Sequence, residues 1–569
     1  MAESIISPGV FTRENDISFI TPAPIQAGAA FIGPTPLGPV EIPTIVTSYS
    51  DYVRKFGDTF QSGSDNHEFF TSMAVRNYFS QGGQTALISR VVSGNFTEAS
   101  ASVVASGSIN AFTIETIGKG VVYNNSGSEN PDGSLVSGSS VNVRWEVAGV
   151  NSQLGTFSLL VRRGDDSTNN KSILETFANV SLDPNSDNYI EKVIGTQKLQ
   201  VVGAGEYVQS VGTYPNASNY IRVKSVNLPT INYLANDGIT VNTTSAGVSY
   251  SASLPLPGSG SFANATGTIA NGAKLYETIN GNTQGLAATD YTKVINLLSN
   301  KDDYQFNIIS TPGLVRSISE HTATISTVIA LAEQRQDCIA VVDLVGYGAT
   351  VTAATGQATG VNSSYAAAYW PWLQLQSVTG KNVWAPASVT IPGVYAFTDA
   401  SSAPWFAPAG LVRGGLAGVI RAERKLTKAD RDILYAAKVN PIATFPGTGI
   451  SVFGQKTLQT KASALDRVNV RRLLIELKKF IGDQARNLVF EQNTIATRNR
   501  FLATVNPYLE SVVQRQGLFA YRVVMDDSNN TADVVDRNQL VGQIFIQPTR
   551  TVEFVVLDFT IEPTGATFS

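Results

Sequence analysis

The sequence predicts an α+β or α/β multidomain protein with a discontinuous α/β core, inserted β-rich domains and extended strand arms at both ends. Three observations lead to this fold class. The chain has 569 residues, which is more than one hydrophobic core usually serves. Patterns typical of helices and buried strands alternate before about residue 95 and return after about residue 290. The stretch between them is rich in Ser, Thr, Asn and Gly, which indicates an insertion into one core.

The first core segment is predicted over residues 21–95. Residues 29–32 form a short apolar strand between glycines and prolines, and residues 65–79 have the apolar spacing of a helix. Residues 87–92 end the segment as a buried strand. This order of a strand, a helix and a second strand is the beginning of an α/β pattern.

The inserted part is predicted to be rich in short strands. Residues 96–200 form an inserted β domain, because apolar and polar residues alternate at the strand period over residues 141–147 and 157–161. Residues 201–289 form a second inserted β-rich region, with few helical patterns and many small polar residues. The sequence indicates no partner for this second region.

The second core segment is predicted over residues 290–535, where the alternation of helices and strands returns. Residues 305–310 and 337–344 are buried strands, and residues 317–336 between them are a helix.

Two more helices are expected later in the same segment. Residues 468–492 carry apolar side chains at helical spacing, with basic side chains elsewhere on the surface. A second helix should run over about residues 494–516, and Pro507 should mark a kink or a break inside it.

Both ends of the chain are predicted to be arms that pair with other copies. Residues 1–20 contain a Pro-Gly break and then β-prone residues, with no partner strand near by in sequence. Residues 536–569 are predicted to form C-terminal strands and an arm, because residues 552–561 read as a strand that is mostly covered on both faces. Such segments can complete a sheet in a neighbouring subunit by strand addition. The side chains assigned to this role are Val10, Phe11, Thr12, Phe554, Val555 and Leu557.

The composition favours large protein interfaces over other kinds of partner. Only 15% of the residues are charged, compared with about 25% in typical soluble proteins. A net charge of −4 disfavours a nucleic-acid partner. The single cysteine, Cys338, excludes an internal disulfide and a cysteine-built zinc site. The first residues do not resemble a signal peptide and no apolar run could span a bilayer, so we expect folding in a reducing cytoplasm and no membrane insertion.

The sequence marks no catalytic, cofactor-binding or metal-binding residue. His67 and His321 are the only histidines, and neither lies beside a recognisable nucleophile and carboxylate. Glycine-rich turns at residues 413–418 and 447–449 lack the lysine and the spacing of nucleotide-binding loops. We therefore expect a protein that is not an enzyme and has no cofactor.

Two other patterns have simpler structural interpretations. The triplet at residues 163–165, Arg-Gly-Asp, falls where a hairpin turn is predicted, so we interpret it as a turn and not as an adhesion motif. Residues 526–530 are acidic and polar, but their spacing does not match a calcium-binding loop. A solvated turn is the favoured interpretation.

A series of short motifs runs in order from residue 7 to residue 493. These are Ser7-Pro8-Gly9-Val10-Phe11, Tyr369-Trp370-Pro371-Trp372, Val383-Trp384-Ala385-Pro386, Ile391-Pro392-Gly393-Val394, Trp405-Phe406-Ala407-Pro408, Val439-Asn440-Pro441-Ile442, Gly447-Thr448-Gly449, Phe453-Gly454-Gln455-Lys456, Arg471-Arg472-Leu473-Leu474 and Val489-Phe490-Glu491-Gln492-Asn493. Each motif is a weak signal alone, but their order is hard to obtain by chance. Together they resemble the contractile-tail sheath protein family, the myovirus-type phage tail sheath.

The resemblance implies a structural function. The chain would be the subunit of a contractile tail sheath that polymerises helically around the tail tube and contracts to drive the tube through the host envelope. Its implied partners are further copies of itself, the tail tube protein, and baseplate and tail terminator proteins. It would reside in the virion after assembly in the host cytoplasm. The alternative interpretation is a surface adhesin or another virion protein with a carbohydrate-binding β domain, which leaves the α/β core and both arms unexplained.

The resemblance also implies that an inward-facing helix of the sheath binds the tube by charge. The candidate tube-facing side chains are Arg471, Arg472, Lys478, Lys479, Arg498 and Arg500. The residues themselves leave a second interpretation open, in which these charges form the solvated face of a helix packed on the core. The sequence does not choose between the two.

Overall fold

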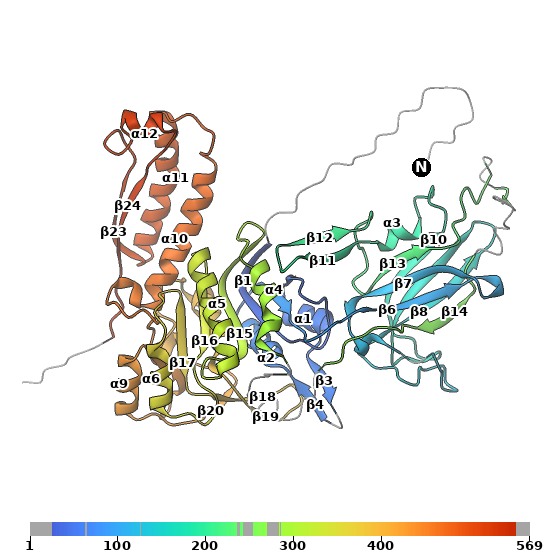
Figure 1. The fold of residues 1–569 in the computed structure, drawn as a ribbon, viewed down its shortest axis with the longest axis horizontal. Coiled ribbons are helices and arrows are strands. Elements are labelled where there is room, and N and C mark those ends of the chain that lie inside the picture. Colours follow the sequence, from blue (N-terminus) through green and yellow to red (C-terminus); the bar gives the residue numbers. More distant parts are fainter. Residues whose placement is uncertain are drawn as a thin grey trace, which may run out of the picture.

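The computed structural model of the chain describes residues 25–62, 65–125, 127–235, 239–242, 254–269, 284 and 286–553. Figure 1 shows three parts in a row: a β-rich part, a central α/β core and a C-terminal lobe of helices that rises from the core. Each part encloses its own cluster of buried hydrophobic side chains. The mixed α/β content predicted from the sequence is confirmed.

The centre of the core is an eight-stranded sheet in the order β2-β5-β1-β15-β16-β17-β21-β22. The strands are β1 (Ile25–Gly33), β2 (Thr44–Val46), β5 (Ala86–Arg90), β15 (Tyr304–Val315), β16 (Ile339–Asp343), β17 (Ala366–Trp370), β21 (Val439–Phe445) and β22 (Gly449–Val452). β1 lies between β5 and β15 and is parallel to both, with Ala29 opposite Ala86 on one side and Ile308 on the other. The sheet therefore joins strands from both sides of the β-rich part.

Helices pack on this sheet and on one another. They are α1 (Tyr49–Phe56), α2 (Phe70–Ser80), α4 (Thr292–Leu297), α5 (Ser319–Arg335), α6 (Val351–Thr359), α7 (Ile391–Ser401), α8 (Gly410–Arg413) and α9 (Lys428–Ala436). α2 contacts β1, β15 and α7, while α5 contacts β15 and β16. A small sheet of β18 (Leu373–Gln376), β19 (Asn382–Ala385) and β20 (Val419–Ala422) completes the core.

The elements predicted in the core are largely confirmed, with one correction. The strands at residues 29–32, 87–92, 305–310 and 337–344 are present, as is the helix predicted over residues 317–336.

The helix predicted over residues 65–79 begins only at Phe70. The preceding residues form β4 (Asp65–Glu68), which pairs with β3 (Thr59–Ser62) so that His67 lies opposite Phe60. Cross-strand pairing of these residues outweighs their helical spacing.

The β-rich part consists of two main sheets that share a core. One sheet contains β6 (Glu98–Val104), β7 (Asn110–Lys119) and β13 (Ile221–Val226); the other contains β8 (Val143–Asn151), β9 (Thr156–Arg163), β10 (Ile173–Ser181) and β14 (Gly258–Ser261). Phe112 and Phe157 stack between the sheets with ring centroids 5.6 Å apart. A hairpin of β11 (Lys198–Val202) and β12 (Tyr207–Val211) and the short helix α3 (Ile190–Ile194) accompany them. Strands from both sides of residue 200 thus share each main sheet.

The C-terminal lobe contains the long helices α10 (Val468–Arg486) and α11 (Ile495–Gln514), the short helix α12 (Ala532–Asp536), and strands β23 (Leu518–Val524) and β24 (Gln543–Pro548). The two predicted helices are confirmed, although α10 ends before residue 492. Pro507 lies inside α11, which continues to Gln514, so the helix is not broken there. No helix in the described part of the chain is long and apolar enough to cross a membrane.

A buried arginine fastens the β-rich part to the core. Arg90, the last residue of β5, is completely buried and donates hydrogen bonds to the carbonyl oxygens of Thr35, Pro36, Gly38 and Lys119 at 2.7–3.2 Å. Three of these acceptors belong to the loop between β1 and β2, and the fourth is the last residue of β7. Because desolvation disfavours the charged form, burial lowers the pKa of Arg90 to about 10.

The same loop makes two further contacts with the β-rich part. The backbone N–H of Gly38 donates to the buried hydroxyl of Tyr123 at 3.0 Å. Leu37 contributes its side chain to the hydrophobic cluster of the β-rich part and not to that of the core. The junction is therefore a packed and hydrogen-bonded joint.

We predict that Arg90→Met lowers the free energy of unfolding by about 3 kcal/mol, because four carbonyl groups lose the hydrogen bonds that Arg90 donates. Denaturant titration followed by fluorescence measures the change. The matched control is Arg54→Met, which removes an exposed arginine paired with Asp51 and should change stability by less than about 1 kcal/mol. Equal effects of the two substitutions would contradict the role of Arg90.

Candidate functional site

The six arm residues of the strand-addition hypothesis lie outside the described residues. Val10, Phe11 and Thr12 precede residue 25, and Phe554, Val555 and Leu557 follow residue 553. Their role stays a prediction. The described part does include the point from which the chain continues toward residue 554.

This exit point is held by a cluster around Glu553. Its carboxylate accepts hydrogen bonds from Arg467 Nε at 2.6 Å, from the hydroxyl of Tyr435 at 2.8 Å and from Gln455 Nε2 at 3.2 Å. Although burial favours the neutral acid, these donors hold the pKa of Glu553 below its usual value. Because Tyr435 lies on α9 and Arg467 precedes α10, the exit point is tied to both the core and the lobe.

The lobe presents a two-stranded ribbon with unpaired edges. β23 and β24 are antiparallel, with Tyr521 opposite Ile546, and within the described residues neither strand pairs with any third strand. The side chains of Tyr521 and Ile546 pack against the hydrophobic cluster of the lobe. Phe519 and Phe545 are exposed, at 68% and 56%. A ribbon of this kind offers backbone groups to an incoming strand.

Arg471 and Arg472 do not lie on a solvated surface, which corrects the expectation from the sequence. They expose only 4% and 3% of their surface. Arg471 stacks on the ring of Tyr365, 4.0 Å from its centroid. Arg472 forms an ion pair with Asp399 at 2.5 Å and stacks on the ring of Tyr395. Both arginines therefore fasten α10 to the core, and neither is accessible to a partner.

Arg498 is also buried, whereas Arg500 is exposed. Arg498 is 5% exposed and donates to Asn493 Oδ1 and to Asp527 Oδ1 at 2.9 and 2.7 Å. It thereby links the start of α11 to the turn that follows β23. The side chain of Arg500 is 60% exposed and lies 3.5 Å from Glu491. Of these two residues, only Arg500 offers its charge to solvent.

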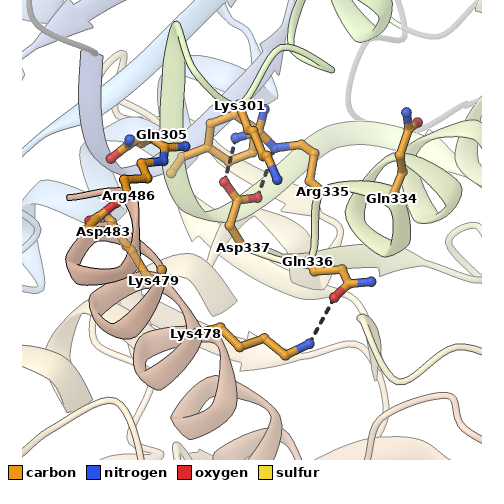
Figure 2. Close-up of a pocket in the computed structure, with 12 residues that line it drawn as sticks. Lys301, Gln305, Gln334, Arg335, Gln336, Asp337, Lys478, Lys479, Asp483 and Arg486 are labelled. Carbon is orange, nitrogen blue, oxygen red and sulfur yellow. Dashed lines mark hydrogen bonds and ion pairs between the residues drawn. The ribbon is translucent and has the colours of Figure 1, made fainter. Parts of the chain in front are cut away.

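Lys478 and Lys479 line a cleft of about 430 Å³ between α10 and the end of α5. Figure 2 shows the cleft, with Lys478 directed toward Gln336, to which it donates a hydrogen bond of 2.9 Å. Five basic and two acidic side chains line it: Lys301, Arg335, Lys478, Lys479, Arg486, Asp337 and Asp483. Basic charge is therefore in excess on the cleft wall.

The floor of the cleft is fixed by Arg335. Its guanidinium donates to the carbonyl oxygens of Leu298 and Tyr304 at 2.5 and 2.6 Å, and it is paired with Asp337 at 2.7 Å. It also stacks on the ring of Phe306. The charge of Arg335 is thus neutralised by Asp337 within the chain, while the lysines of the cleft remain available to a partner.

The side chains that could act in catalysis, His321, Cys338 and Asp343, are buried inside the fold. His321 is buried, and its Nδ1 accepts a hydrogen bond from the backbone N–H of Val315. Burial raises the pKa of the Cys338 thiol well above its usual value. Asp343 is buried too, its pKa is raised to about 7 by desolvation, and it accepts hydrogen bonds from Ser388. No cluster of possible metal ligands occurs among the described residues.

We predict that Arg472→Met lowers the free energy of unfolding by about 3 kcal/mol, because it leaves the carboxylate of Asp399 without its partner. Arg500→Met, the control on α11, should change stability by less than about 1 kcal/mol. Thermal and denaturant unfolding measure both. A neutral result for Arg472→Met would show that this arginine does not fasten the lobe.

Two family models match the second half of the chain. The model of the phage tail sheath protein central domain matches residues 284–458, and the model of the phage tail sheath C-terminal domain matches residues 460–562. The tail sheath protein of Vibrio phage KVP40 is 36% identical over 245 residues, which are 42% of this chain and 36% of that protein. The tail sheath protein of Enterobacteria phage T4 is 34% identical over 259 residues, which are 42% of this chain and 39% of that protein.

The chain thus spans less than two-fifths of the length of these curated relatives. The fold is also similar to a crystal structure of a sheath tail protein from Listeria innocua. The TM-score is 0.53, and the match covers 92% of this chain and 95% of that chain at 11% identity. At this identity, the likeness concerns the fold alone.

Proposed function

Because the chain belongs to the contractile-tail sheath protein family, we propose that it is the subunit of a sheath that polymerises helically around a tail tube and contracts. The observation that carries the proposal is the β23–β24 ribbon, whose outer edges are unpaired among the described residues. A protein that completes such a sheet with strands from other copies forms a lattice. In this proposal the lattice, which contains no catalytic step, is the functional unit.

The strands that complete the ribbon are proposed to come from residues 1–20 and from residues after 553 of other copies. About five ladder hydrogen bonds contribute roughly 1 kcal/mol each. Buried side chains such as Val10, Phe11 and Leu557 would add about 1.5–3 kcal/mol each, before the entropy of ordering the arm is subtracted. A joint of this strength would persist while subunits move.

Contraction is proposed to be a movement of rigid bodies on these joints. The exit point at Glu553 is bonded to the core and to the lobe, so an arm that begins there starts from a fixed position. Arg471 and Arg472 hold α10 on the core, so the lobe moves with it. Exposed ion pairs between neighbouring bodies are worth about 0–1 kcal/mol each and can be exchanged during the movement.

The tail tube is proposed to contact Arg500 on α11. Of the six candidate tube-facing residues, Arg471, Arg472 and Arg498 are buried within the chain. Lys478 and Lys479 line a recess, which suits a protruding segment better than the convex wall of a tube. Arg500 stands out on the helix surface with only a long ion pair to Glu491. At the two ends of the sheath, baseplate and tail terminator proteins are the proposed partners, and the virion is the proposed location.

Deletion of residues 2–16 is expected to leave a folded, monodisperse protein that cannot form tubes, because the strand donor is lost. Negative-stain microscopy of the purified chain detects the tubes, and circular dichroism monitors the fold. The control is deletion of residues 2–5, which keeps the β-prone segment and should still permit tubes. Normal polymers from the longer deletion would contradict the arm model.

Arg500→Glu is expected to reduce co-assembly with the tail tube protein, because it reverses the exposed charge on α11. Co-sedimentation of purified sheath subunits with preformed tubes gives the bound fraction. The matched control is Lys428→Glu, which reverses an exposed charge on α9. If both variants bind tubes as the unchanged chain does, Arg500 takes no part in the contact.

A further inference from the structure

We propose that the cleft beside α10 binds the acidic turn of a second copy of the chain. The acidic turn consists of residues 526–536, which contain four aspartates and no basic residue. This inference rests on the proposed helical assembly and adds to it a specific contact between subunit bodies. The strand joints proposed above do not involve either surface.

The cations of the cleft are only partly neutralised within the chain. Arg335 is paired with Asp337 inside the cleft, and Arg486 is paired with Asp302 at 2.8 Å. Lys301 and Lys479 make no ion pair with any described residue, and Lys478 is bonded only to the neutral amide of Gln336. The cleft therefore has three lysine charges and one carboxylate, Asp483, without an ion pair among the described residues, so a net positive charge remains for an anionic segment to neutralise (Figure 2).

Gln305 is 9% exposed and lines the cleft, and its buried Oε1 accepts no hydrogen bond within the described part of the chain. Because this atom is an acceptor, the lysines, and not Gln305, are the groups that attract an anionic segment. Carboxylates accept hydrogen bonds from both lysine and amide groups, and charge-assisted bonds are the stronger ones.

The acidic turn has the charge that the cleft requires. It follows β23 and includes α12, which Figure 1 shows at the end of the lobe remote from the core. Asp526, Asp527, Asp533 and Asp536 are all exposed. Within the chain, Asp527 is paired with Arg498 and Asp533 with Arg537, so Asp536 and Asp526 have no ion pair among the described residues.

The two surfaces are different, and this suits a helical assembly. When a surface of one copy binds a different surface of the next copy, the contact is heterologous and repeats along a ring or a helix. Complementary charges also align the copies and exclude wrong registers. Because the partners are charged and near solvent, the contact should weaken as salt concentration rises.

Two charge-reversed variants test the contact. Variant one carries Lys478→Glu and Lys479→Glu, so both its cleft and its turn are acidic. Variant two carries Asp526→Lys, Asp533→Lys and Asp536→Lys, so its turn has three lysines and one aspartate and both its cleft and its turn are basic. We expect each variant alone to need at least about tenfold higher concentration to form tubes than the unchanged chain, because like charges meet at every contact. An equimolar mixture should regain assembly, since every contact in an alternating polymer is then complementary.

Pelleting assays at several protein and salt concentrations, with negative-stain microscopy, measure assembly. Thermal melting verifies that each variant is folded. The matched control for variant one, Lys425→Glu with Lys428→Glu, makes the same change in net charge at exposed residues of the core and should assemble normally.

The outcomes separate this contact from the proposed function. If the unchanged chain forms tubes and both folded variants form them equally well, the contact does not exist. If the variants fail alone and their mixture also fails, the charges act elsewhere and the pairing of cleft with turn is overturned. If the unchanged chain forms no tubes, the proposed function fails; the pairing would then still be supported by association of the two variants in sedimentation velocity and overturned by its absence.

Discussion

Parallel pairing between β1 and β15 is the constraint on which the rest of the molecule depends. β1 lies between two strands, so its backbone groups are paired on both sides, and Ala29 to Ile32 are almost completely buried. Gly28 permits Tyr78 of α2 to approach, since a Cβ at that position would lie 2.1 Å from the tyrosine hydroxyl. Because β5 and β15 flank β1, the β-rich part leaves the core after one neighbour of β1 and rejoins it before the other, and Arg90 holds it there.

Several arginines in this chain hold its structural elements together. Arg90, Arg335, Arg471 and Arg472 each hold two elements together through carbonyl groups, carboxylates or aromatic rings. The planar guanidinium suits this role, because it can stack on a ring and donate several hydrogen bonds at once. The lysines of the cleft differ, since their flexible and strongly hydrated charges stay near solvent. Basic residues close together in sequence therefore have separate functions.

Periodicity in the sequence predicted where the long helices lie but not which of their charges are accessible. The apolar spacing of residues 468–492 identified α10, yet Arg471 and Arg472 are buried against Tyr365 and Tyr395, which are about 75–105 residues earlier in the chain. Such contacts depend on tertiary packing and leave no local pattern. The cleft was missed for the same reason, because it brings α10 together with segments that are separate from it in sequence. The C-terminal strands expected over residues 536–569 include β24, but the sequence did not indicate that β24 pairs with β23.

The proposed contractile lattice would need contacts of two kinds, which the proposed strand joints and the charged cleft would provide. Strand pairing buries backbone groups in a fixed register, so it resists salt and persists through a large rotation of the subunits. A charged cleft gains less free energy, and its ion pairs can exchange water for a new partner with little loss. If the two kinds were interchanged, the proposed movement of subunits would be blocked and the proposed strand joints would separate. The concentration of charge on the cleft and the acidic turn, in a chain with few charges, is what this division of roles requires.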